Sequence, residues 1–386
     1  MIYHNVGGLL MKKKTNNNTD NIFTFIDLFA GIGGFHIAMH SVGGHCVFAS
    51  EWDKNARITY EATYKEVEPR LFEKDEHGRY LFFNGDINDA IPEEIPQFDV
   101  LCGGFPCQAF SIAGLRKGFE DTRGTLFFNI AAIVDRKTKQ GQRPKVLFLE
   151  NVKGLKNHMG GQTLDTLKRV LTEDLGYEIS LQVLNAKYFG VPQNRERLFF
   201  VCWDKKQIPV DEFRFPFGLT EKGSTLYSLQ EAKDHCKKTR VGDIFEPAAS
   251  LDPKFTISDK MWVGHQERKK RNKANGKGFG YSLFTSESPY ASTISARYWK
   301  DGSEILIAQD GKNPRKLTPV EAGRLQGYCI EGAGWENPSA KIHEDIQMKI
   351  VVSPKEAYHQ FGNSVAVPVI KAIAREIKIQ LLDKAK

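Results

Sequence analysis

One cysteine of the chain lies where it could act as a nucleophile. Cys107 follows a proline in the stretch GGFPCQAFSIAG (103–114), directly after an apolar run at 99–103. The carboxyl ends of parallel strands form the functional edge of an α/β sheet, so a loop at this place presents its side chains to a ligand. We therefore interpret Cys107 as a reactive thiol, whereas Cys102, inside the run, is expected to be a small core residue.

Charged side chains at the ends of later runs could assist this thiol. Glu150 ends VLFLE, which is too apolar a lead-in for a surface position, and QNRERLFFV (193–201) supplies Arg195 and Arg197. Alternate residues of a strand point to one side, so both guanidinium groups can face one cleft. A thiol, a carboxylate and two guanidinium groups indicate covalent catalysis on a heterocycle, because the guanidinium groups favour the thiolate and can bind a carbonyl oxygen.

A glycine-rich turn follows the first apolar run and begins a helical stretch. FIDLFAGIGGF places Gly31, Gly33 and Gly34 where a tight turn lets the backbone approach a ligand closely. The spacing resembles a dinucleotide fingerprint, but His36 occupies the last glycine position of G-x-G-x-x-G. The motif alone is weak and leaves a purely structural turn open.

Residues at the ends of the next two runs favour a nucleoside ligand. Glu51 can accept hydrogen bonds from ribose hydroxyls, and Trp52 offers a face on which adenine can stack. Asp86 is placed to bind the adenine amino group. Ligands on three successive strand ends predict a nucleoside cofactor, but they do not distinguish NAD from S-adenosylmethionine.

These residues need a scaffold that brings several strand ends to one edge. Apolar runs of strand length occupy 22–29, 46–50, 80–84, 99–103 and 145–152, and helical stretches occupy 34–42, 125–139 and 162–175. Continuous apolar runs suit parallel strands that are covered on both faces. The runs at 177–186 and 197–203 suit an antiparallel pair at the sheet edge. The pattern predicts a Rossmann-like, doubly wound α/β domain.

The character of the chain changes after Trp203. Residues 205–312 carry basic clusters, scattered aromatics and many turn residues, with the densest cluster at 267–280. The periodicity of the last segment predicts a helix that packs back on the first domain, which is then discontinuous. We divide the chain into a disordered N-terminal tail (1–20), a first domain (21–204 plus 356–386) and a second, smaller domain (205–355).

Composition and charge exclude several classes of protein. With 386 residues, of which 41% are hydrophobic and 26% charged, the chain has ordinary globular composition, and its net charge of +7 is compatible with a polyanionic partner. No apolar run approaches the roughly 20 residues of a membrane span, and the N-terminus lacks a secretory signal, so we expect a cytoplasmic protein. The six cysteines form no C-x-x-C pair and no Cys/His cluster with ligand spacing, which argues against a structural zinc or a disulfide framework.

Together, the motifs resemble those of the bacterial-type DNA (cytosine-5)-methyltransferases. The matching pieces, in the order of that family, are FIDLFAGIGGF, EWD, GD, GGFPCQAFSIAG, ENV, QNRER, RKLTPVEAGRLQG (315–327) and FGNSVAVPV (361–369). They cover most of the chain outside 205–310. The tRNA cytosine-5 methyltransferases share the cofactor core and are the alternative. A silent DNA-binding relative is a third hypothesis, which the intact set of charged residues disfavours.

The resemblance implies a reaction and its partners. The methyl group of S-adenosylmethionine would pass to C5 of a cytosine flipped out of double-stranded DNA, leaving S-adenosylhomocysteine. Cys107 would add to C6, Glu150 would act at N3, and Arg197, with Arg195, would hold O2. No metal is required. The enzyme would act as a monomer in the modification arm of a restriction–modification system, with the cognate restriction endonuclease as its functional partner.

The resemblance also implies the binding residues. The expected cofactor pocket comprises Phe29, Ala30, Gly31, Ile32, Gly33, Gly34, Glu51, Trp52, Asp86, Ile87, Pro106, Leu126, Asn363, Ser364 and Val365. The expected DNA contacts are Ser111, Arg116, Lys117, Gly278, Gly280, Thr293 and Arg297. Residues after Cys107 would form a lid that closes over DNA, and 205–310 would be the target-recognition domain. Asn363 would tie the C-terminal segment to the first strand.

Overall fold

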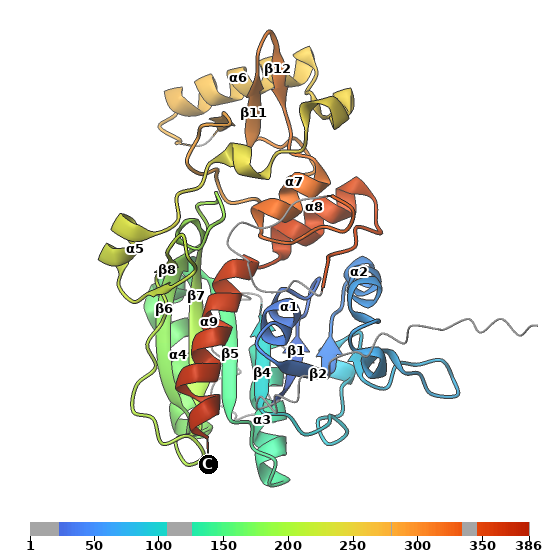
Figure 1. Cartoon of the computed structure of the whole chain (residues 1–386), viewed down its shortest axis with the longest axis vertical. Coiled ribbons are helices and arrows are strands. Elements are labelled where there is room, and N and C mark those ends of the chain that lie inside the picture. The colour runs from blue at the N-terminus through green and yellow to red at the C-terminus, as the bar shows by residue number, and fades with distance from the viewer. Residues whose placement is uncertain (1–22, 106–125, 279, 334–345, 386) are drawn as a thin grey trace, which may run out of the picture.

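Figure 1 shows the computed structural model, which describes residues 23–105, 126–278, 280–333 and 346–385. A seven-stranded sheet with strand order β3-β2-β1-β4-β5-β7-β6 forms its core. The five parallel strands are β1 (Phe23–Leu28), β2 (Gly44–Ser50), β3 (Phe83–Asn84), β4 (Val100–Gly104) and β5 (Val146–Val152). Each lies within or beside a predicted apolar run, so the parallel part of the sheet is confirmed.

The antiparallel pair is also confirmed, with one addition. β6 (Glu178–Asn185) pairs antiparallel with β7 (Glu196–Trp203), and β7 pairs antiparallel with β5. The chain therefore passes β5, forms the edge strand β6 and returns between them as β7. This return brings Arg197 opposite Val152, which lies two residues after Glu150 in β5.

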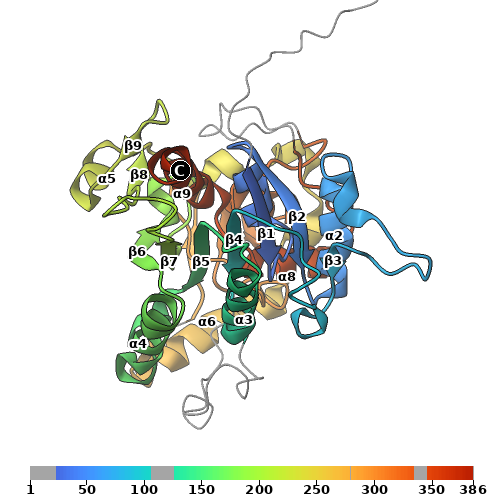
Figure 2. The same cartoon turned by 90° about the horizontal axis from the view of Figure 1, so that it is seen from below.

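Helices cover both faces of the sheet, as Figure 2 shows. α1 (Gly34–His40), α2 (Lys54–Tyr64) and α9 (Val367–Gln380) contribute to one hydrophobic cluster, and α3 (Leu126–Lys139) and α4 (Gln162–Arg169) contribute to the other. A doubly wound α/β fold requires this arrangement, and the prediction of that fold class is confirmed. Among the described residues, no helix has both the length and the apolar character that crossing a bilayer requires.

The C-terminal helix packs back on the first part of the chain, as its periodicity predicted. Ile370, Ile373 and Ile377 of α9 are fully buried, and Val365 lies where a side chain of Gly34 would be. Residues far apart in sequence thus share the cluster that covers β1 and β2. Burial of apolar surface contributes roughly 25 cal/mol per Å² and accounts for this docking.

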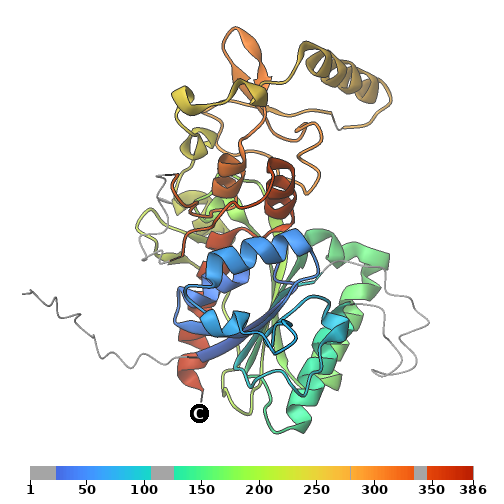
Figure 3. The same ribbon diagram turned by 90° about the vertical axis from the view of Figure 1, so that its right-hand side faces the viewer.

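A smaller part of the molecule lies above the edge at which the parallel strands end (Figures 1 and 3). It contains the basic helix α6 (Asp259–Ala274) and a small sheet of β10 (Leu283–Phe284), β11 (Leu306–Gln309) and β12 (Lys312–Arg315). α7 (Pro319–Leu325) and α8 (Pro354–Asn363) lie between this part and the large sheet. The basic run predicted at 267–280 begins as the last turns of α6.

Some residues after Trp203 lie against the first domain. Phe213 and Phe215 belong to the same hydrophobic cluster as α9, and Tyr227 donates a hydrogen bond to Glu376 of that helix (3.1 Å). β8 (Gly218–Leu219), β9 (Thr225–Leu226) and α5 (Leu229–His235) belong to this region. The domain boundaries at 205 and 355 remain predictions.

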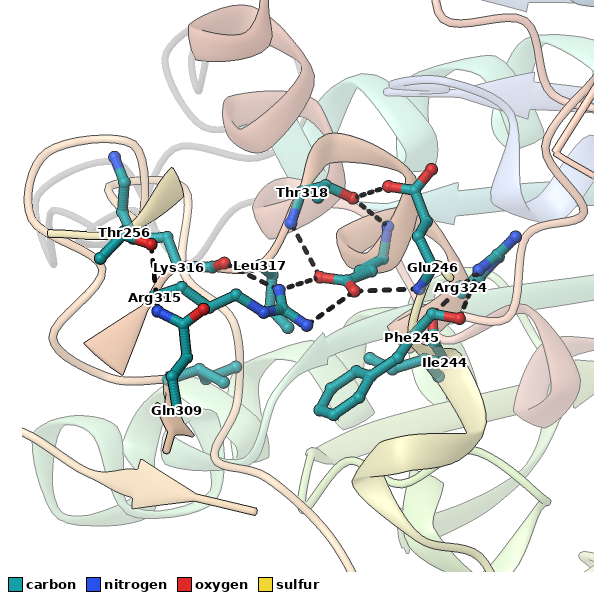
Figure 4. A network of polar contacts seen from close by, with 12 residues as sticks. Ile244, Phe245, Glu246, Thr256, Gln309, Arg315, Lys316, Leu317, Thr318 and Arg324 are labelled. Atoms are coloured by element: carbon teal, nitrogen blue, oxygen red, sulfur yellow. Dashed lines mark hydrogen bonds and ion pairs between the residues drawn. The ribbon is translucent and has the colours of Figure 1, made fainter. Parts of the chain in front are cut away.

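A buried polar network joins the small sheet to α7 (Figure 4). Arg315 binds both oxygens of Glu321, at 2.6 and 2.9 Å. Glu321 also accepts hydrogen bonds from the backbone N–H groups of Thr318 and Glu246, both at 3.0 Å. Arg324 donates to the carbonyl oxygens of residues 244 and 245. The fully buried carboxylate thus has partners on three segments, as a charge without water must have.

We expect Glu321→Gln to lower the free energy of unfolding by about 3–5 kcal/mol, because it leaves the Arg315 guanidinium buried without its counter-charge. Urea unfolding followed by circular dichroism measures this change. Asp135→Asn is the control: it breaks an exposed pair with Lys139 (2.7 Å) and should cost below about 1 kcal/mol. Equal effects of the two substitutions would contradict this role of the network.

Candidate functional site

The turn after β1 has a backbone conformation that few residues adopt. Phe29, Gly31 and Gly33 have positive φ angles of 55°, 56° and 82°. A positive φ is rare for an aromatic residue and common at ligand sites. A Cβ atom at Gly33 would lie 2.4 Å from the Tyr64 ring, whose hydroxyl donates to Gly33 O (2.7 Å). Glycine at 33 is therefore required by both conformation and space.

Glu51, at the end of β2, holds this turn in place. One carboxylate oxygen accepts a hydrogen bond from Gly31 N (2.7 Å) and the other accepts from Asp53 N (2.7 Å). Burial raises the pKa of Glu51, and these two hydrogen bonds oppose the rise. The residue predicted to bind ribose thus also shapes the glycine turn from within the first domain.

The strand ends and the end of α8 line a single pocket of about 610 Å³. The predicted residues that line it are Phe29, Gly31, Ile32, Glu51, Trp52, Leu126, Glu150, Arg195, Arg197, Asn363 and Ser364. Segments from both ends of the chain therefore meet at one site. The pocket joins the glycine turn, predicted to bind the cofactor, to the charged residues predicted to be catalytic.

A second hollow, of about 680 Å³, adjoins this pocket beside Trp52. The Trp52 side chain is 74% exposed, which leaves its ring available for stacking. Asp86 lines the hollow, and one of its oxygens accepts from Asn88 N (2.9 Å). Arg57, which the sequence analysis missed, also lines it and donates to Glu51 O and Trp52 O. The adenine-binding prediction is compatible with this surface.

Three other residues predicted to bind the cofactor are described by the structure but do not line the pocket. Ala30 N donates to Ser50 O (3.0 Å), Ile87 is buried in a hydrophobic cluster, and Val365 fills the space beside Gly34. Five predicted residues lie outside the described residues: Pro106, Cys107, Ser111, Arg116 and Lys117. The chain can be followed to Phe105, which lines the pocket two residues before Cys107.

Glu150 and Arg197 form the charged pair of the site. Arg197 Nε lies 3.1 Å from Glu150 Oε1, and the Glu150 residue is 8% exposed. Burial raises the pKa of Glu150, while the positive charges of Arg197 and, to a smaller extent, Arg195 oppose this rise. The arrangement keeps a carboxyl group that can hold a proton inside a pocket that is open to a ligand.

Arg195 lines the same pocket but is held by backbone carbonyl groups. Its guanidinium donates to Ile294 O (3.3 Å), Gly362 O (3.4 Å) and Ser364 O (2.5 Å). Burial and, to a smaller extent, the positive charge of the neighbouring Arg197 together lower the pKa of Arg195 to about 9. The two arginines predicted to act together therefore differ: Arg197 contacts the carboxylate, and Arg195 connects three segments of the chain.

Comparison with known proteins places this site in a family. The model of the C-5 cytosine-specific DNA methylases matches residues 23–379. The chain belongs to this family. The resemblance inferred from the motifs is confirmed, and the chain is a DNA (cytosine-5-)-methyltransferase that, as a member of this family, uses S-adenosylmethionine.

Relatives of this methylase match nearly its whole length. The type II methyltransferase M.SsoII of Shigella sonnei is 48% identical over 369 residues, 95% of this chain and 83% of that protein. The type II methyltransferase M1.ScrFI of Lactococcus lactis subsp. cremoris is 47% identical, covering 94% of this chain and 80% of that protein. The crystal structure of S. pombe Dnmt2 methyltransferase, 15% identical, superposes with a TM-score of 0.62 over 92% of this chain and 98% of that one, which shows the shared fold.

Asn151 is a residue of the methylase site that the sequence analysis missed. Its amide donates to Phe105 O (2.8 Å) and its carbonyl accepts from Val152 N (2.8 Å). The side chain is buried and fixes the end of β4, from which the chain continues to Cys107. The one sequence feature that could have indicated Asn151 is its position inside the ENV motif, next to Glu150.

Two buried glutamines, also missed, connect the second part of the methylase to its sheet. Gln193 accepts from Ile294 N (3.1 Å) and donates to Leu325 O (3.0 Å) and to Gln326 Oε1 (3.1 Å). Gln326 in turn donates to Phe361 O (2.6 Å). Both lie within motifs quoted above, QNRER and RLQG, but only the fold shows that they meet.

The predicted DNA contacts that the structure describes lie at two places. Thr293 lies beside the site and donates to Asn194 O (2.7 Å), next to Arg195 in the chain. Arg297 is exposed. Gly278 lies in open space after α6, whereas a Cβ atom at Gly280 would lie 2.9 Å from the Lys269 side chain. Thr293 is thus close to the pocket-lining Arg195, whereas the two glycines follow α6 in the second part.

The C-terminal segment is tied to the first domain by neighbours of Asn363. The Asn363 amide lies 3.3 Å from His359 Nε2, within α8. The connection to the rest of the site comes from Ser364, whose carbonyl accepts from Arg195 and whose hydroxyl lies 2.6 Å from the Tyr328 hydroxyl. Asn363 still lines the pocket, so its predicted contact with the cofactor stays a prediction.

We expect Gly33→Ala to destabilise the protein by about 2–4 kcal/mol and to weaken binding of S-adenosylmethionine, because a methyl group meets the Tyr64 ring and the backbone requires positive φ. Thermal unfolding and calorimetric titration measure these effects. Gly78→Ala is the matched control, since Gly78 has a φ of 76° but open space around it. If Gly33→Ala and Gly78→Ala change stability and S-adenosylmethionine binding equally, the close packing of Gly33 against Tyr64 contributes to neither.

The pKa of Glu150 predicts a pH dependence of stability. Because the folded-state pKa lies above the ordinary value of 4.5, the folded protein holds a proton that the unfolded chain releases. The bound proton therefore adds to the free energy of unfolding. This contribution is fully present below pH 4.5 and is lost as the pH rises through the folded-state pKa of Glu150. We therefore expect wild type to lose stability relative to Glu150→Gln over that interval, measured as the difference in urea midpoints. A difference in urea midpoints that does not change with pH would contradict the raised pKa of Glu150.

Proposed function

We propose that this methylase transfers a methyl group to C5 of a flipped-out cytosine in a specific duplex DNA sequence, through a covalent bond between Cys107 and C6. The observation that carries the proposal is the Glu150–Arg197 pair, which shares one pocket with the glycine turn and with Phe105. The type II names of its relatives support a role in a restriction–modification system, with a cognate restriction endonuclease as functional partner.

The residues of the pocket fit S-adenosylmethionine. The positive-φ turn allows close backbone approach, Glu51 offers oxygens for the ribose hydroxyls, and the exposed Trp52 ring offers a stacking face. Asp86 in the adjoining hollow can accept from the adenine amino group. When bound, S-adenosylmethionine supplies an electrophilic methyl group and leaves as S-adenosylhomocysteine.

The protein must make C5 of cytosine nucleophilic, because this carbon is too poor a nucleophile unaided. The Cys107 thiolate adds to C6, and the electron pair of the C5–C6 double bond moves toward C5 and the ring. Glu150 holds a proton at N3 and stabilises the adduct, while Arg197 binds O2 and orients Glu150. After methylation, C5 loses its proton and the C6–S bond breaks, which releases Cys107. These steps need no metal ion.

The second part of the molecule is proposed to recognise DNA. The target base must leave the duplex, because the thiol and the methyl donor cannot reach opposite faces of a stacked base. Lys269, Lys270, Arg271, Lys273 and Lys277 are exposed on and after α6, where they can neutralise phosphates. We assign 205–355 to target recognition on this basis. One catalytic unit acts on one base, so a monomer in the prokaryotic cytoplasm suffices.

We expect purified protein to transfer label from S-adenosylmethionine to duplex DNA but not to tRNA, with the product at C5 of cytosine. Cys107→Ser should lower the rate by a factor of roughly 10³ or more, because the C6 adduct cannot form. Radiolabel incorporation measures the rate, and bisulfite sequencing of DNA from expressing cells identifies the methylated cytosine.

Two outcomes would overturn this proposal. Labelling of tRNA instead of DNA would favour the RNA-modifying alternative. Full activity of Cys107→Ser would exclude the covalent mechanism. Duplex DNA containing 5-fluorocytosine provides an independent test: it should trap a covalent complex with wild type and none with Cys107→Ser, because fluorine at C5 prevents the final elimination.

A further inference from the structure

One face of α1 carries two members of a cluster of potential metal ligands. His36 and His40 are one helical turn apart and therefore lie on the same face of α1. Glu68, which follows α2, lies against them, with its Oε1 4.0 Å from His40 Nδ1. One ligand atom from each of the three residues lies within 4.8 Å of the other two. None of the three lines the pocket described above.

His36 is buried with one ring nitrogen unused. Its ring is fully buried and stacks on Tyr64, with centroids 4.0 Å apart. Its Nδ1 lies 2.7 Å from the Tyr60 hydroxyl, whereas its Nε2 has no hydrogen-bond partner among the described residues. Burial, followed by the charge of His40, lowers the pKa of His36. A neutral imidazole is the form that binds a metal ion.

The surroundings of His36 resemble the support of a metal ligand. When Nδ1 donates to the Tyr60 hydroxyl, that hydroxyl can donate to Asp27 Oδ2 (3.4 Å). Histidine ligands commonly donate their second N–H to a polar group or carboxylate, which fixes the tautomer and orients the ring. This chain of hydrogen bonds directs the lone pair to Nε2, the atom that lacks a partner.

The other side of the cluster offers a further ligand and negative potential. His45 Nδ1 lies 3.3 Å from Glu68 Oε1, and its side chain is 49% exposed. His40 is the last residue of α1, where the carbonyl end of a helix favours a cation. Entry from solvent is possible because the His40 side chain is 24% exposed.

We propose that His36, His40 and Glu68 bind one zinc-type divalent cation, with His45 or water as the fourth ligand. Imidazole and carboxylate ligands suit Zn²⁺ in tetrahedral geometry. Bonds of about 2.1 Å require the ligand atoms to approach to about 3.4 Å, which the partly exposed His40 can achieve by a small side-chain rotation. The ion would connect α1 to Glu68 and, where His45 is the fourth ligand, also to β2. It takes no part in methyl transfer, so this site is independent of the proposed reaction.

The test uses the untagged full chain, freed of metal with a chelator and then titrated with ZnCl₂. Bound zinc is counted by mass spectrometry after gel filtration, and thermal unfolding is followed with and without the ion. We expect wild type to bind one more zinc than His40→Ala or Glu68→Gln. Zinc should raise the melting temperature of wild type by roughly 2–5 °C.

Cysteine thiolates can also bind zinc, so the difference between variants decides the result. His77→Ala is the matched control, because His77 is exposed beside Glu76 (3.5 Å) and should leave both readouts unchanged. If His40→Ala fails to fold, Glu68→Gln and the visible absorption of the Co²⁺ complex replace it. Equal zinc content and equal thermal shifts in wild type and both cluster variants would overturn the proposal, as would absence of zinc binding.

Discussion

The site depends on the hydrogen bonds that the buried guanidinium of Arg195 donates. It donates to carbonyl oxygens of Ile294, Gly362 and Ser364, which come from the second part of the molecule and from the C-terminal segment. A buried charge needs several hydrogen bonds to offset its lost hydration. These two segments must therefore meet at the start of β7, and their meeting closes the wall of the pocket around Glu150 and Arg197.

This connection extends through side-chain amides and charges rather than through apolar packing alone. Gln193 and Gln326 connect β7 to α7, and the Arg315–Glu321 pair connects α7 to the small sheet. Hydrogen bonds depend on direction, whereas apolar contacts do not, so such a path fixes the orientation of the second part over the strand ends. The arrangement places Thr293 against Asn194, which directly precedes Arg195 in the chain.

The sheet could be predicted because its strands are buried on both faces and read as continuous apolar runs. The return of β7 between β5 and β6 could not, because pairing order depends on contacts among residues far apart in sequence. Likewise, Glu150 and Arg197 were recognised individually, but their 3.1 Å contact follows from that return. Asn151, Gln193 and Gln326 were missed because a buried amide has no pattern of its own until its partners are known.

The sequence by itself determined the family, the order of the strands along the chain and the residue types available for chemistry. These features rest on local spacing: glycines at a turn, a carboxylate after an apolar run and alternate arginines in a strand. Tertiary structure alone decided which arginine contacts Glu150 and which connects segments. It also decided that His36, the residue that interrupts the glycine fingerprint, packs with His40 and Glu68 away from the pocket. Burial and hydrogen-bond partners arise from long-range packing, and local spacing does not encode them.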